Sequence, residues 1–529
     1  MTGCFPYTDA YIKELKSHPY MKYAALQRQA GISDPYRPVF HFSAPEGPMN
    51  DPNGLCYWKG LWHLFYQAFP PEGAIRWGHA VSCDLLHWTD LPYALNPDIE
   101  EACWSGAALA EDDRVIVFYY GKGLGNIAAV SSDPLLLSWD KIGVLKEEDG
   151  KPYEVYDPCI WKQDDYYYSL SGRAVPHACM PDCERTEYLF RSKDLVNWEY
   201  MHPFIQGGNG CIPGDDGACP YFWPIGSGKH LLLHFSHMSG EKYLIGKYDT
   251  QRHKFLGKRG GAFQSEVNGS FAGGIAAASA APMENGDVLM AVNQTEGCMW
   301  PLGGAYQVMC LPRRLSAAGV NLNELAQSPA PDFSALHTNG KELRGITLPA
   351  GKEVLLPHFK GNVMELEMEF EASEMFPTLD ISVLRSDDGS EATHIRIYRQ
   401  RGWRDWAHFE QCGAWEGRPY DTVITLDNTD SSLSEYAICR APDSGSLFIH
   451  PSESLRLRIF VDKSIIEVFV NEKLCLSTRA YPVKKDSTGV SVRAKERDGK
   501  LICASMWDFS GHQFIGCELT QQSKACKPV

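Results

Sequence analysis

Acidic residues stand at or just before three runs of strand-forming residues. Asp51 lies in PMNDPNG (48–54), Asp157 in YEVYDPCIW (153–161), and Asp215 and Asp216 in GDDGACP (214–220). Turn residues that close a loop are the simplest explanation for any one of them alone. Carboxylates gathered in one pocket could instead cleave a glycosidic bond, one attacking the anomeric carbon while a second, protonated, donates to the leaving oxygen. The adjacent charges of Asp215 and Asp216 could raise the pKa of such an acid.

Aromatic residues surround these acidic segments. Aromatic faces stack well on sugar rings, although many of these side chains are expected to belong to a core. The residues concerned are Trp62, Tyr66, Trp77, Trp104, Trp161, Phe222 and Trp223. Carbohydrate chemistry therefore accounts for both the acids and their neighbours.

A polar turn followed by an alternating strand occurs five times in the first 330 residues. The five copies are WKGLWHLFYQA near residue 58, DDRVIVFYYG near 112, QDDYYYSLSG near 163, GSGKHLLLHFSH near 226 and ENGDVLMAVNQ near 284. Related segments follow some of them, namely SCDLLHW (82–88), SKDLVNW (192–198) and the looser SDPLLLSW (132–139). Radial repetition of such units predicts a five-bladed β-propeller, whose first strands deliver side chains to a central cavity.

The remaining sequence predicts two further regions around this propeller, which we place at residues 36–330. Residues 1–35 are expected to form a helical extension, with one or two short amphipathic helices. Residues 316–334 resemble a loop-like linker. Beyond it, VMELEMEFEAS (363–373) and LRLRIFVD (455–462) alternate apolar and polar residues, which is typical of strands with one buried face. We therefore expect an all-β protein that ends in an antiparallel β-sandwich over 338–520.

Composition narrows the possible partners. The net charge of −16 over 529 residues argues against nucleic acid, and no run is long enough for a membrane span. No secretory signal is visible at the start, and the 17 cysteines are scattered, so we expect reduced thiols in a cytoplasmic protein. His177, Cys179, Asp182 and Cys183 match no standard zinc spacing, and we predict neither metal nor cofactor.

Several motifs together resemble glycoside hydrolase family 32, the invertases, inulinases, levanases and fructosyltransferases. They are MNDPNG, FYQ (65–67), WGHAVS (77–82), WSGAA (104–108), the Asp-Pro of YDP (156–158), LPRRL (311–315), LRIFVDKSIIEVFVNE (457–472) and STRAYP (477–482). The resemblance covers nearly the whole chain beyond residue 35, in the right order, and implies a propeller followed by a sandwich.

The resemblance also implies roles for individual residues. Asp51 corresponds to the nucleophile and Asp157 to the carboxylate that stabilises the transition state. Side chains that would line a fructosyl pocket are Asn50, Gln67, Trp77, Ser105, Tyr156 and Asp216.

Two departures from the family pattern stand out. Tyr156 replaces the arginine of the usual Arg-Asp-Pro, so a neutral phenol with one donor stands where a guanidinium is expected. Ala218 stands where the acid/base glutamate of Glu-Cys-Pro is expected. We rank Asp215 first as the replacement acid, ahead of Asp216 and then Glu187 from the loop at 173–187.

These observations leave several functions open. The leading one is a retaining β-fructofuranosidase acting on small fructosides such as sucrose or short fructo-oligosaccharides. A fructosyltransferase would use the same residues, and Tyr156 and the altered acid site also suit a hydrolase of an unusual fructoside or fructose dianhydride. A non-catalytic fructoside-binding propeller is the alternative of another class. A homo-oligomer formed through the sandwich is possible.

Overall fold

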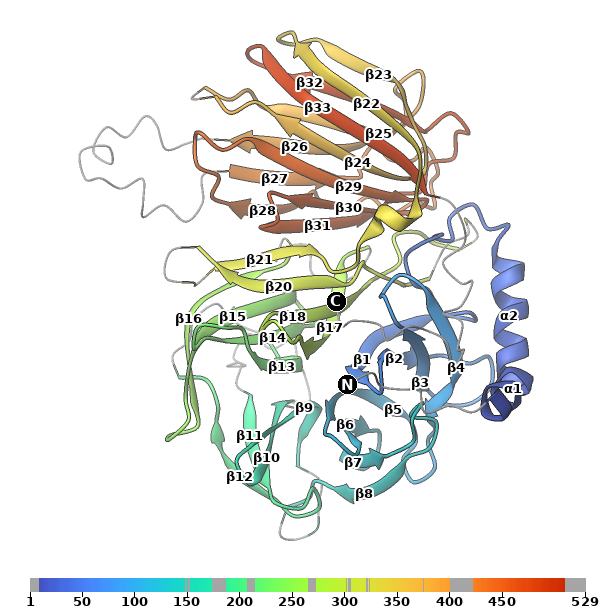
Figure 1. The fold of residues 1–529 in the computed structure, drawn as a ribbon, viewed down its shortest axis with the longest axis vertical. Coiled ribbons are helices and arrows are strands. Elements are labelled where there is room, and N and C mark those ends of the chain that lie inside the picture. The colour runs from blue at the N-terminus through green and yellow to red at the C-terminus, as the bar shows by residue number, and fades with distance from the viewer. Residues whose placement is uncertain are drawn as a thin grey trace, which may run out of the picture.

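The computed structural model describes residues 9–147, 150, 153–173, 187–206, 215–264, 273–300, 302, 306–319, 322, 324–373, 375–399 and 422–509. Its architecture is all-β apart from two N-terminal helices and a short 3-10 helix, η2 (Phe333–Leu336). Figure 1 shows two layers of long strands above a group of smaller sheets, with the helices at one side. The predicted all-β class is confirmed.

Residues 49–329 form five antiparallel sheets in chain order, which we call sheets one to five. Sheet one contains β1 (Met49–Trp58), β2 (Leu61–Ala68), β3 (Arg76–Ser82) and β4 (Trp88–Leu95), and sheet two contains β5 (Cys103–Ala110), β6 (Val115–Gly121), β7 (Gly125–Ser131) and β8 (Asp140–Val144). Sheet three contains β9 (Val155–Gln163), β10 (Tyr166–Arg173), β11 (Tyr188–Ser192) and β12 (Trp198–Pro203), and sheet four contains β13 (Ala218–Pro224), β14 (His230–Ser236), β15 (Gly240–Asp249) and β16 (Lys254–Ala262). Sheet five contains β17 (Ile275–Pro282), β18 (Val288–Gln294), β20 (Arg313–Ala318) and β21 (Glu324–Pro329), with β19 (Val308–Met309) beside β18.

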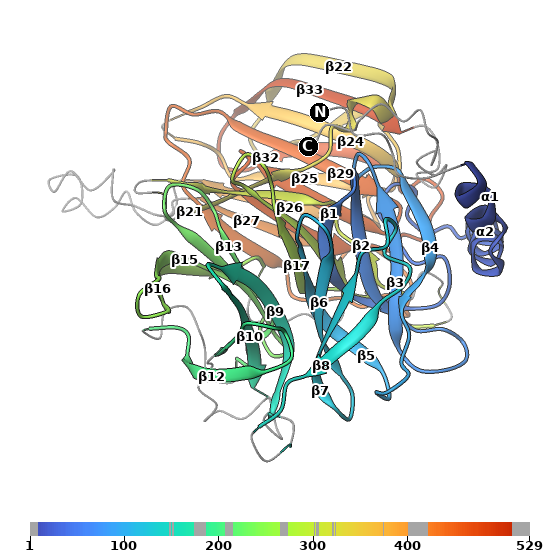
Figure 2. The same cartoon turned by 60° about the horizontal axis from the view of Figure 1, so that its bottom comes forward.

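The first strand of every sheet contacts the first strands of its two neighbours. Strand β1 contacts β5 and β17, β5 contacts β9, and β13 contacts both β9 and β17. Figure 2 shows the sheets fanning outward from these strands. A residue near the start of a first strand therefore lies close to its counterparts in the other sheets.

The sequence repeats correspond to the second strands and to a turn. All five predicted copies place their alternating residues in β2, β6, β10, β14 and β18. In the turn between β3 and β4, the Ser82 hydroxyl accepts the backbone N–H of Leu85 at 2.8 Å and Asp84 accepts that of His87 at 2.8 Å. Ser192 and Asp194 make the same pattern before β12. The S-x-D-L segments are thus Asx and Ser turns that reverse the chain before the outermost strand.

One expectation is wrong. Residues 316–334 were expected to be a loop-like linker, yet β20 extends to Ala318 and β21 (Glu324–Pro329) pairs with it along the edge of sheet five. The residues of β21, ELAQSP, have little preference for a strand, so its pairing with β20 rather than local propensity selects the strand.

Two helices at the N-terminal end, α1 (Asp9–Ser17) and α2 (Pro19–Gly31), lie against sheet one. Arg28 on α2 forms a two-pronged ion pair with Asp90 on β4, with N–O distances of 2.8 and 2.9 Å. Neither these nor any other helix in the described parts of the chain combines the length and apolarity that a bilayer crossing needs.

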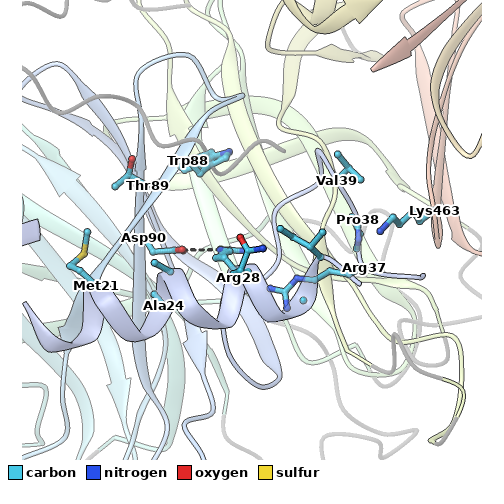
Figure 3. A pocket seen from close by; sticks show the side chains of 14 residues that line it. Met21, Ala24, Arg28, Arg37, Pro38, Val39, Trp88, Thr89, Asp90 and Lys463 are labelled. Carbon is cyan, nitrogen blue, oxygen red and sulfur yellow. Dashed lines mark hydrogen bonds and ion pairs between the residues drawn. The ribbon is translucent and has the colours of Figure 1, made fainter. Parts of the chain in front are cut away.

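A cavity of about 380 Å³ lies where α2, β4 and the sandwich meet (Figure 3). Arg28, Arg37 and Lys463 line it together with apolar atoms of Met21 and Trp88. None of the acidic residues selected from the sequence lines it, so this cavity is separate from the carboxylate site described below.

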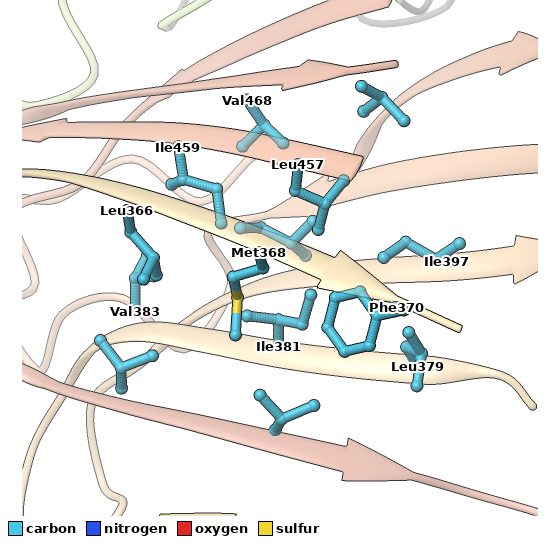
Figure 4. Packing of buried hydrophobic residues seen from close by; sticks show 14 of the residues in the cluster. Leu366, Met368, Phe370, Leu379, Ile381, Val383, Ile397, Leu457, Ile459 and Val468 are labelled. Atoms are coloured by element: carbon cyan, nitrogen blue, oxygen red, sulfur yellow. The ribbon is translucent and has the colours of Figure 1, made fainter. Parts of the chain in front are cut away.

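Two six-stranded sheets complete the fold and pack face to face. One has the order β22 (His337–Leu348), β33 (Gly499–Phe509), β24 (Val363–Phe370), β29 (Leu455–Asp462), β30 (Ile465–Val470), β31 (Leu474–Arg479); the other has β23 (Glu353–Lys360), β32 (Gly489–Ala494), β25 (Leu379–Arg385), β26 (Thr393–Arg399), β27 (Thr422–Asp427), β28 (Asp443–Leu447). Their inner faces share one hydrophobic core, in which Leu366, Met368 and Phe370 of β24 meet Ile381 of β25 (Figure 4). The predicted alternation of β24 is confirmed on this face. On its other face Glu365 is buried as well, because it pairs with Arg458 and His337.

A buried ionic network joins the start and the end of the five-sheet region to the sandwich. His41 contacts Asp462 at 3.0 Å and Glu467 at 3.1 Å, and Arg313 contacts Glu467 at 2.7 Å, all with fully buried side chains. Burial opposes charge on His41, but its two carboxylate partners raise its pKa. Against the effect of burial, Arg313 and His41 lower the pKa of Glu467 to about 2. The hairpin β29–β30 thus holds both ends of the five-sheet region by charge.

Substituting Glu467 tests how much this network stabilises the fold. We expect Glu467→Gln to lower the free energy of unfolding by about 3–5 kcal/mol, because the substitution leaves the buried Arg313 charge uncompensated. Denaturant unfolding of both proteins measures the difference.

The matched control is Glu371→Gln, which breaks the ion pair of Glu371 with Lys500, whose side chains are about half exposed. An exposed pair of this kind contributes about 0–1 kcal/mol. Equal effects of the two substitutions would contradict a special role for the buried network.

Candidate active site

Irregular pairing near the start of the first strands aims side chains toward the common centre. Each of the five first strands departs from regular register with its neighbour at this end. At four of these irregularities one residue has a left-handed backbone: Gly54 (φ 51°), Asp157 (φ 49°), Cys219 (φ 44°) and Ala277 (φ 47°). A β-bulge adds an unpaired residue and re-aims its side chain. Three non-glycine residues held in this region of φ mark strain of the kind that collects at functional sites.

Asp51 is fixed by two hydrogen bonds to one of its oxygens. The Ser105 hydroxyl donates to Oδ2 at 2.5 Å and the Gln67 amide donates to the same atom at 3.1 Å. Gln67 also donates to Ser105 at 2.7 Å, so the three side chains from β1, β2 and β5 form one unit. Burial raises the pKa of Asp51, while the Ser105 hydrogen bond and the charge of His237 oppose that rise.

Asp157 lies beside Asp51, with the thiol of Cys219 between them. The Cys219 sulfur is 3.6 Å from Asp157 Oδ2 and 3.9 Å from Asp51 Oδ2. Burial and the charge of Asp51 raise the pKa of Asp157 to about 7. A carboxyl group poised near neutrality beside a second carboxylate is the electrostatic signature of a functional site.

Asp216 is the third carboxylate of the cluster and is 4% exposed. Its Oδ2 accepts a hydrogen bond from the Tyr156 hydroxyl at 2.7 Å and contacts Nδ1 of His237 at 2.6 Å. Its Oδ1 accepts the backbone N–H of His237 at 3.2 Å. The Tyr156 phenol, which replaces the expected arginine, thus donates its one hydrogen bond to Asp216.

Asp215 occupies a different environment from its neighbour. It is fully buried, accepts a hydrogen bond from Ser239 at 2.6 Å, and forms an ion pair of 2.8 Å with the equally buried ammonium of Lys242. Both contacts engage the carboxyl group inside the protein, away from any group that enters from solvent. This geometry argues against our ranking of Asp215 ahead of Asp216 as the acid.

The other predicted residues take supporting places. The Asn50 side-chain oxygen accepts a hydrogen bond from Asn293 at 3.1 Å. Trp77 is fully buried and its indole donates to the carbonyl of Trp104 at 2.8 Å, so it supports the segment that carries Ser105. A direct contact of Trp77 with a sugar stays a prediction. Glu187, the third acid candidate, is also buried.

Among the aromatic residues selected from the sequence, Trp104 is the exposed one, with 38% of its surface accessible. Its ring packs edge-on against Tyr120, with centroids 6.0 Å apart, and Tyr120 packs edge-on against Tyr156 at 6.4 Å. This chain of rings runs from the surface to the Tyr156–Asp216 hydrogen bond. It forms an aromatic wall beside the carboxylates.

The sequence analysis missed three members of the cluster: His237, Cys219 and Glu241. Burial raises the pKa of Glu241 to about 8, and the charge of Asp51 adds to the rise. Glu241 Oε2 accepts the backbone N–H of Ala278 at 3.0 Å. The repeat segment GSGKHLLLHFSH ends at His237 but assigns it no chemical role, because the places of His237 and Glu241 depend on the pairing of β14 with β15 and on sheet five. The described residues contain no group of acidic, His or Cys side chains arranged for a metal, and the segment 177–183 lies outside them.

Family models match almost the entire described chain. The N-terminal domain of glycosyl hydrolases family 32 matches residues 41–329, and the C-terminal part of that family matches residues 332–508. The chain belongs to glycosyl hydrolase family 32. The resemblance expected from the motifs is thereby confirmed, and the protein is a glycoside hydrolase.

Individual relatives within family 32 span the same length. Sucrose-6-phosphate hydrolase from Bacillus subtilis (strain 168) is 27% identical over 89% of this chain and 94% of its own. Beta-fructofuranosidase 1 from Zea mays is 27% identical over 85% of this chain and 75% of its own. The crystal structure of fructan 1-exohydrolase IIa from Cichorium intybus superposes with a TM-score of 0.77 at 21% identity, covering 92% of this chain and 99% of the other. The overall fold is therefore that of a family 32 enzyme.

Ser105→Ala tests the hold on Asp51. Loss of a donor to an ionised acceptor destabilises the charged form by about 1.5–3 kcal/mol, so the pKa of Asp51 should rise by about one pH unit or more. If the reaction requires Asp51 in its ionised form, the acidic limb of the kcat/KM profile should move upward in pH by the same amount.

Ser131→Ala is the control, since Ser131 is buried but accepts from the backbone N–H of Asp133 in a distant turn. An unchanged acidic limb in Ser105→Ala would contradict the assigned hydrogen bond.

Asp157→Asn tests the electrostatic cost of the site. The folded-state pKa of about 7 lies above that of an unfolded aspartate, so the folded protein holds a proton that the unfolded chain releases. The free energy of unfolding of Asp157→Asn should therefore rise relative to that of wild type from about pH 4 to pH 7, and the difference should then stay constant. Thermal unfolding across this range measures it.

Asp84→Asn should become less stable relative to wild type as the pH rises, which is the opposite trend. The reason is that hydrogen bonds to the ionised carboxylate of Asp84, including that of His87, outweigh burial and lower its pKa. A pH-independent effect of Asp157→Asn would contradict the raised pKa.

Proposed function

We propose that this glycoside hydrolase removes terminal β-fructofuranosyl residues from small fructosides, with retention of configuration. The observation that carries the proposal is the pair of carboxylates Asp51, partly buried on β1, and Asp157, buried on β9, which meet at the thiol of Cys219, with Asp51 held by Ser105 and Gln67. Membership of family 32 supports the fructosyl specificity.

Asp51 is the nucleophile in this proposal. Ser105 and Gln67 hold its Oδ2, so Oδ1 is the atom that we expect to attack the anomeric carbon. The product of the first step is a covalent fructosyl-enzyme, which water then hydrolyses. A nucleophile held in one rotamer needs little reorganisation to reach the transition state.

Asp157 stabilises the positive charge that develops on the fructosyl ring. Its ionised carboxylate costs free energy in the empty site, as the raised pKa indicates, and an oxocarbenium-like transition state would relieve that cost. An interaction stronger in the transition state than in the free enzyme is the kind that accelerates a reaction.

The five sheets are, in this proposal, the blades of a β-propeller over residues 36–330, followed by a β-sandwich over 338–520. The contacts among β1, β5, β9, β13 and β17 support it, because first strands that meet at a common centre are the defining feature of a propeller. Asn50, Gln67, Ser105, Tyr156 and Asp216 would line the fructosyl pocket, and Trp104 would stack on the sugar beyond it.

The size of the substrate is inferred from the relatives. Their names include sucrose-6-phosphate hydrolase, raffinose invertase and fructan exohydrolases. Small fructosides are common to all of them, and we therefore propose sucrose or short fructo-oligosaccharides. Transfer to a sugar instead of water would use the same residues. A cytoplasmic location and a homo-oligomer through the sandwich stay predictions from the sequence.

Asp51→Ala provides the direct test of this function. The wild-type protein should release fructose from sucrose, from short inulin-type oligosaccharides or from nitrophenyl β-fructofuranoside. Asp51→Ala should release none from any of them, because no other group can form the fructosyl ester. Thermal unfolding must show that the variant is folded.

A wild-type protein that binds fructosides in calorimetry but releases fructose from none of them would overturn the enzymatic proposal. The chain would then be a sugar-binding member of the family. Full activity of Asp51→Ala would overturn the assignment of the nucleophile alone.

A further inference from the structure

The proposed hydrolysis needs a proton donor for the leaving oxygen, and the expected one is missing. Ala218 occupies the position of the glutamate, and Asp215 is fully buried in an ion pair with Lys242. Among the described residues around Asp51 and Asp157, the group best placed to donate a proton is an imidazole.

We propose that His237, oriented by Asp216, is the general acid and base of this enzyme. The proposal rests on the function proposed above and supplies its missing proton transfer. It assigns Asp216 as the positioning residue and His237 as the residue that contacts the leaving group.

The geometry fixes Nδ1 of the His237 ring against Asp216 and leaves Nε2 for another partner. His237 lies in the turn between β14 and β15, where both its backbone N–H and its Nδ1 contact the carboxylate of Asp216. Phe235 packs edge-on against the ring at 5.0 Å. The side chain is 45% exposed, and no described residue is recorded as a hydrogen-bond partner of Nε2. An imidazole held at Nδ1 by a carboxylate and open at Nε2 is the arrangement of a general acid and base.

The surrounding charges favour the protonated ring. The charges that act on His237 are those of Asp216 before β13, Asp157 on β9 and Asp51 on β1, and the Tyr156 hydroxyl shares Oδ2 of Asp216 with it. Burial opposes charge on His237, but the hydrogen bond and charge of Asp216, followed by the charges of Asp157 and Asp51, raise its pKa. A raised pKa favours the imidazolium, which is the form in which a general acid carries its proton.

The two departures from the family pattern, Tyr156 and Ala218, are both compatible with His237 as the acid. An arginine at position 156 would place a second cation beside Asp216 and would disfavour protonation of His237. The Tyr156 phenol satisfies a lone pair of Asp216 with a neutral donor. Ala218 and Cys219 leave this side of the cluster small and uncharged.

The proton balance of both steps is closed. In the first step Asp51 forms a bond to the anomeric carbon, the bond to the leaving oxygen breaks, and His237 Nε2 gives its proton to that oxygen. In the second step the neutral imidazole takes a proton from water as the water oxygen bonds to the anomeric carbon. The ester bond breaks, its electron pair returns to Asp51, and His237 is again an imidazolium.

Glu241 is the remaining alternative donor. Its raised pKa would keep it protonated at neutral pH, but it is 1% exposed and its carboxyl group contacts the backbone of Ala278 in sheet five. It thus lies behind the cluster, at the junction of sheets four and five. A leaving group entering from solvent meets His237 before Glu241.

The deciding experiment compares His237→Gln, Glu241→Gln and Asp51→Ala on sucrose and on nitrophenyl β-fructofuranoside. We expect His237→Gln to lower kcat/KM on sucrose by about 10²–10⁴-fold, since that is the usual contribution of general acid catalysis. The loss on the nitrophenyl substrate should be much smaller because nitrophenolate leaves without a proton. The basic limb of the wild-type pH profile on sucrose should disappear, and imidazole should restore part of the activity of His237→Ala.

His253→Asn is the matched control, because His253 lies in the neighbouring turn of the same sheet with φ 51°, a conformation that asparagine tolerates. It should leave both substrates unaffected. Two results would overturn the proposal: equal losses of activity of His237→Gln on both substrates, or a loss that depends on the leaving group in Glu241→Gln alone. The proposed function would still stand in either case if the wild type is active and Asp51→Ala is inert. A wild-type protein inert on every substrate would overturn the function and His237 with it.

Discussion

Placing several carboxylates around one buried centre is the constraint on which the rest of this structure depends. Like charges in a site that excludes water repel one another and lose hydration, and the pKa of about 7 for Asp157 expresses that cost. The fold compensates with few donors: Ser105 and Gln67 on Asp51, and Tyr156 and His237 on Asp216. The charge that remains uncompensated is the charge that a cationic transition state could neutralise.

Holding such a site together requires that five sheets stay closed around it. In the described parts of the chain no disulfide joins sheet one to sheet five, and the chain passes from the fifth sheet into the sandwich. The sandwich solves this problem, because Asp462 and Glu467 at one hairpin bind both His41, ahead of sheet one, and Arg313, in sheet five. Arg479, on the adjoining strand, adds a hydrogen bond of 2.8 Å to the carbonyl of Tyr306. The second domain thus acts as a clamp, and its charges are buried where they are screened least.

The change at position 156 of the family pattern is coupled to His237 through one carboxylate. Asp216 links Tyr156, from sheet three, to His237, from sheet four. Replacing a guanidinium by a phenol removes a charge from this link, and a protonated imidazole can then share the same carboxylate. A substitution that weakens the family motif at one position therefore changes the chemistry open to a residue 81 positions away in sequence, counted from 156 to 237.

Much of this protein could be predicted from its sequence because the signals are local. Polar turns followed by alternating residues gave the second strand of every small sheet, S-x-D-L segments gave turns, and the turn-rich flanks of Asp51 and Asp157 marked the starts of first strands. These features depend on a residue and its near neighbours, which the sequence displays directly. Strand β21 escaped notice because its pairing with β20 rather than its own composition makes it a strand.

Only the tertiary structure separated Asp215 from Asp216. The two residues are adjacent and chemically identical, yet one meets the Lys242 ammonium and the other meets Tyr156 and His237. It also buried Trp77 while exposing Trp104, and it brought His237 to the carboxylates although the repeat segment that ends at this residue gives no sign of such a place. Burial and charge pairing arise from strands of different sheets, so sequence spacing cannot reveal them. The sequence therefore determined the repeat and the candidate carboxylates, and the packing of the sheets decided the burial and the partners of each.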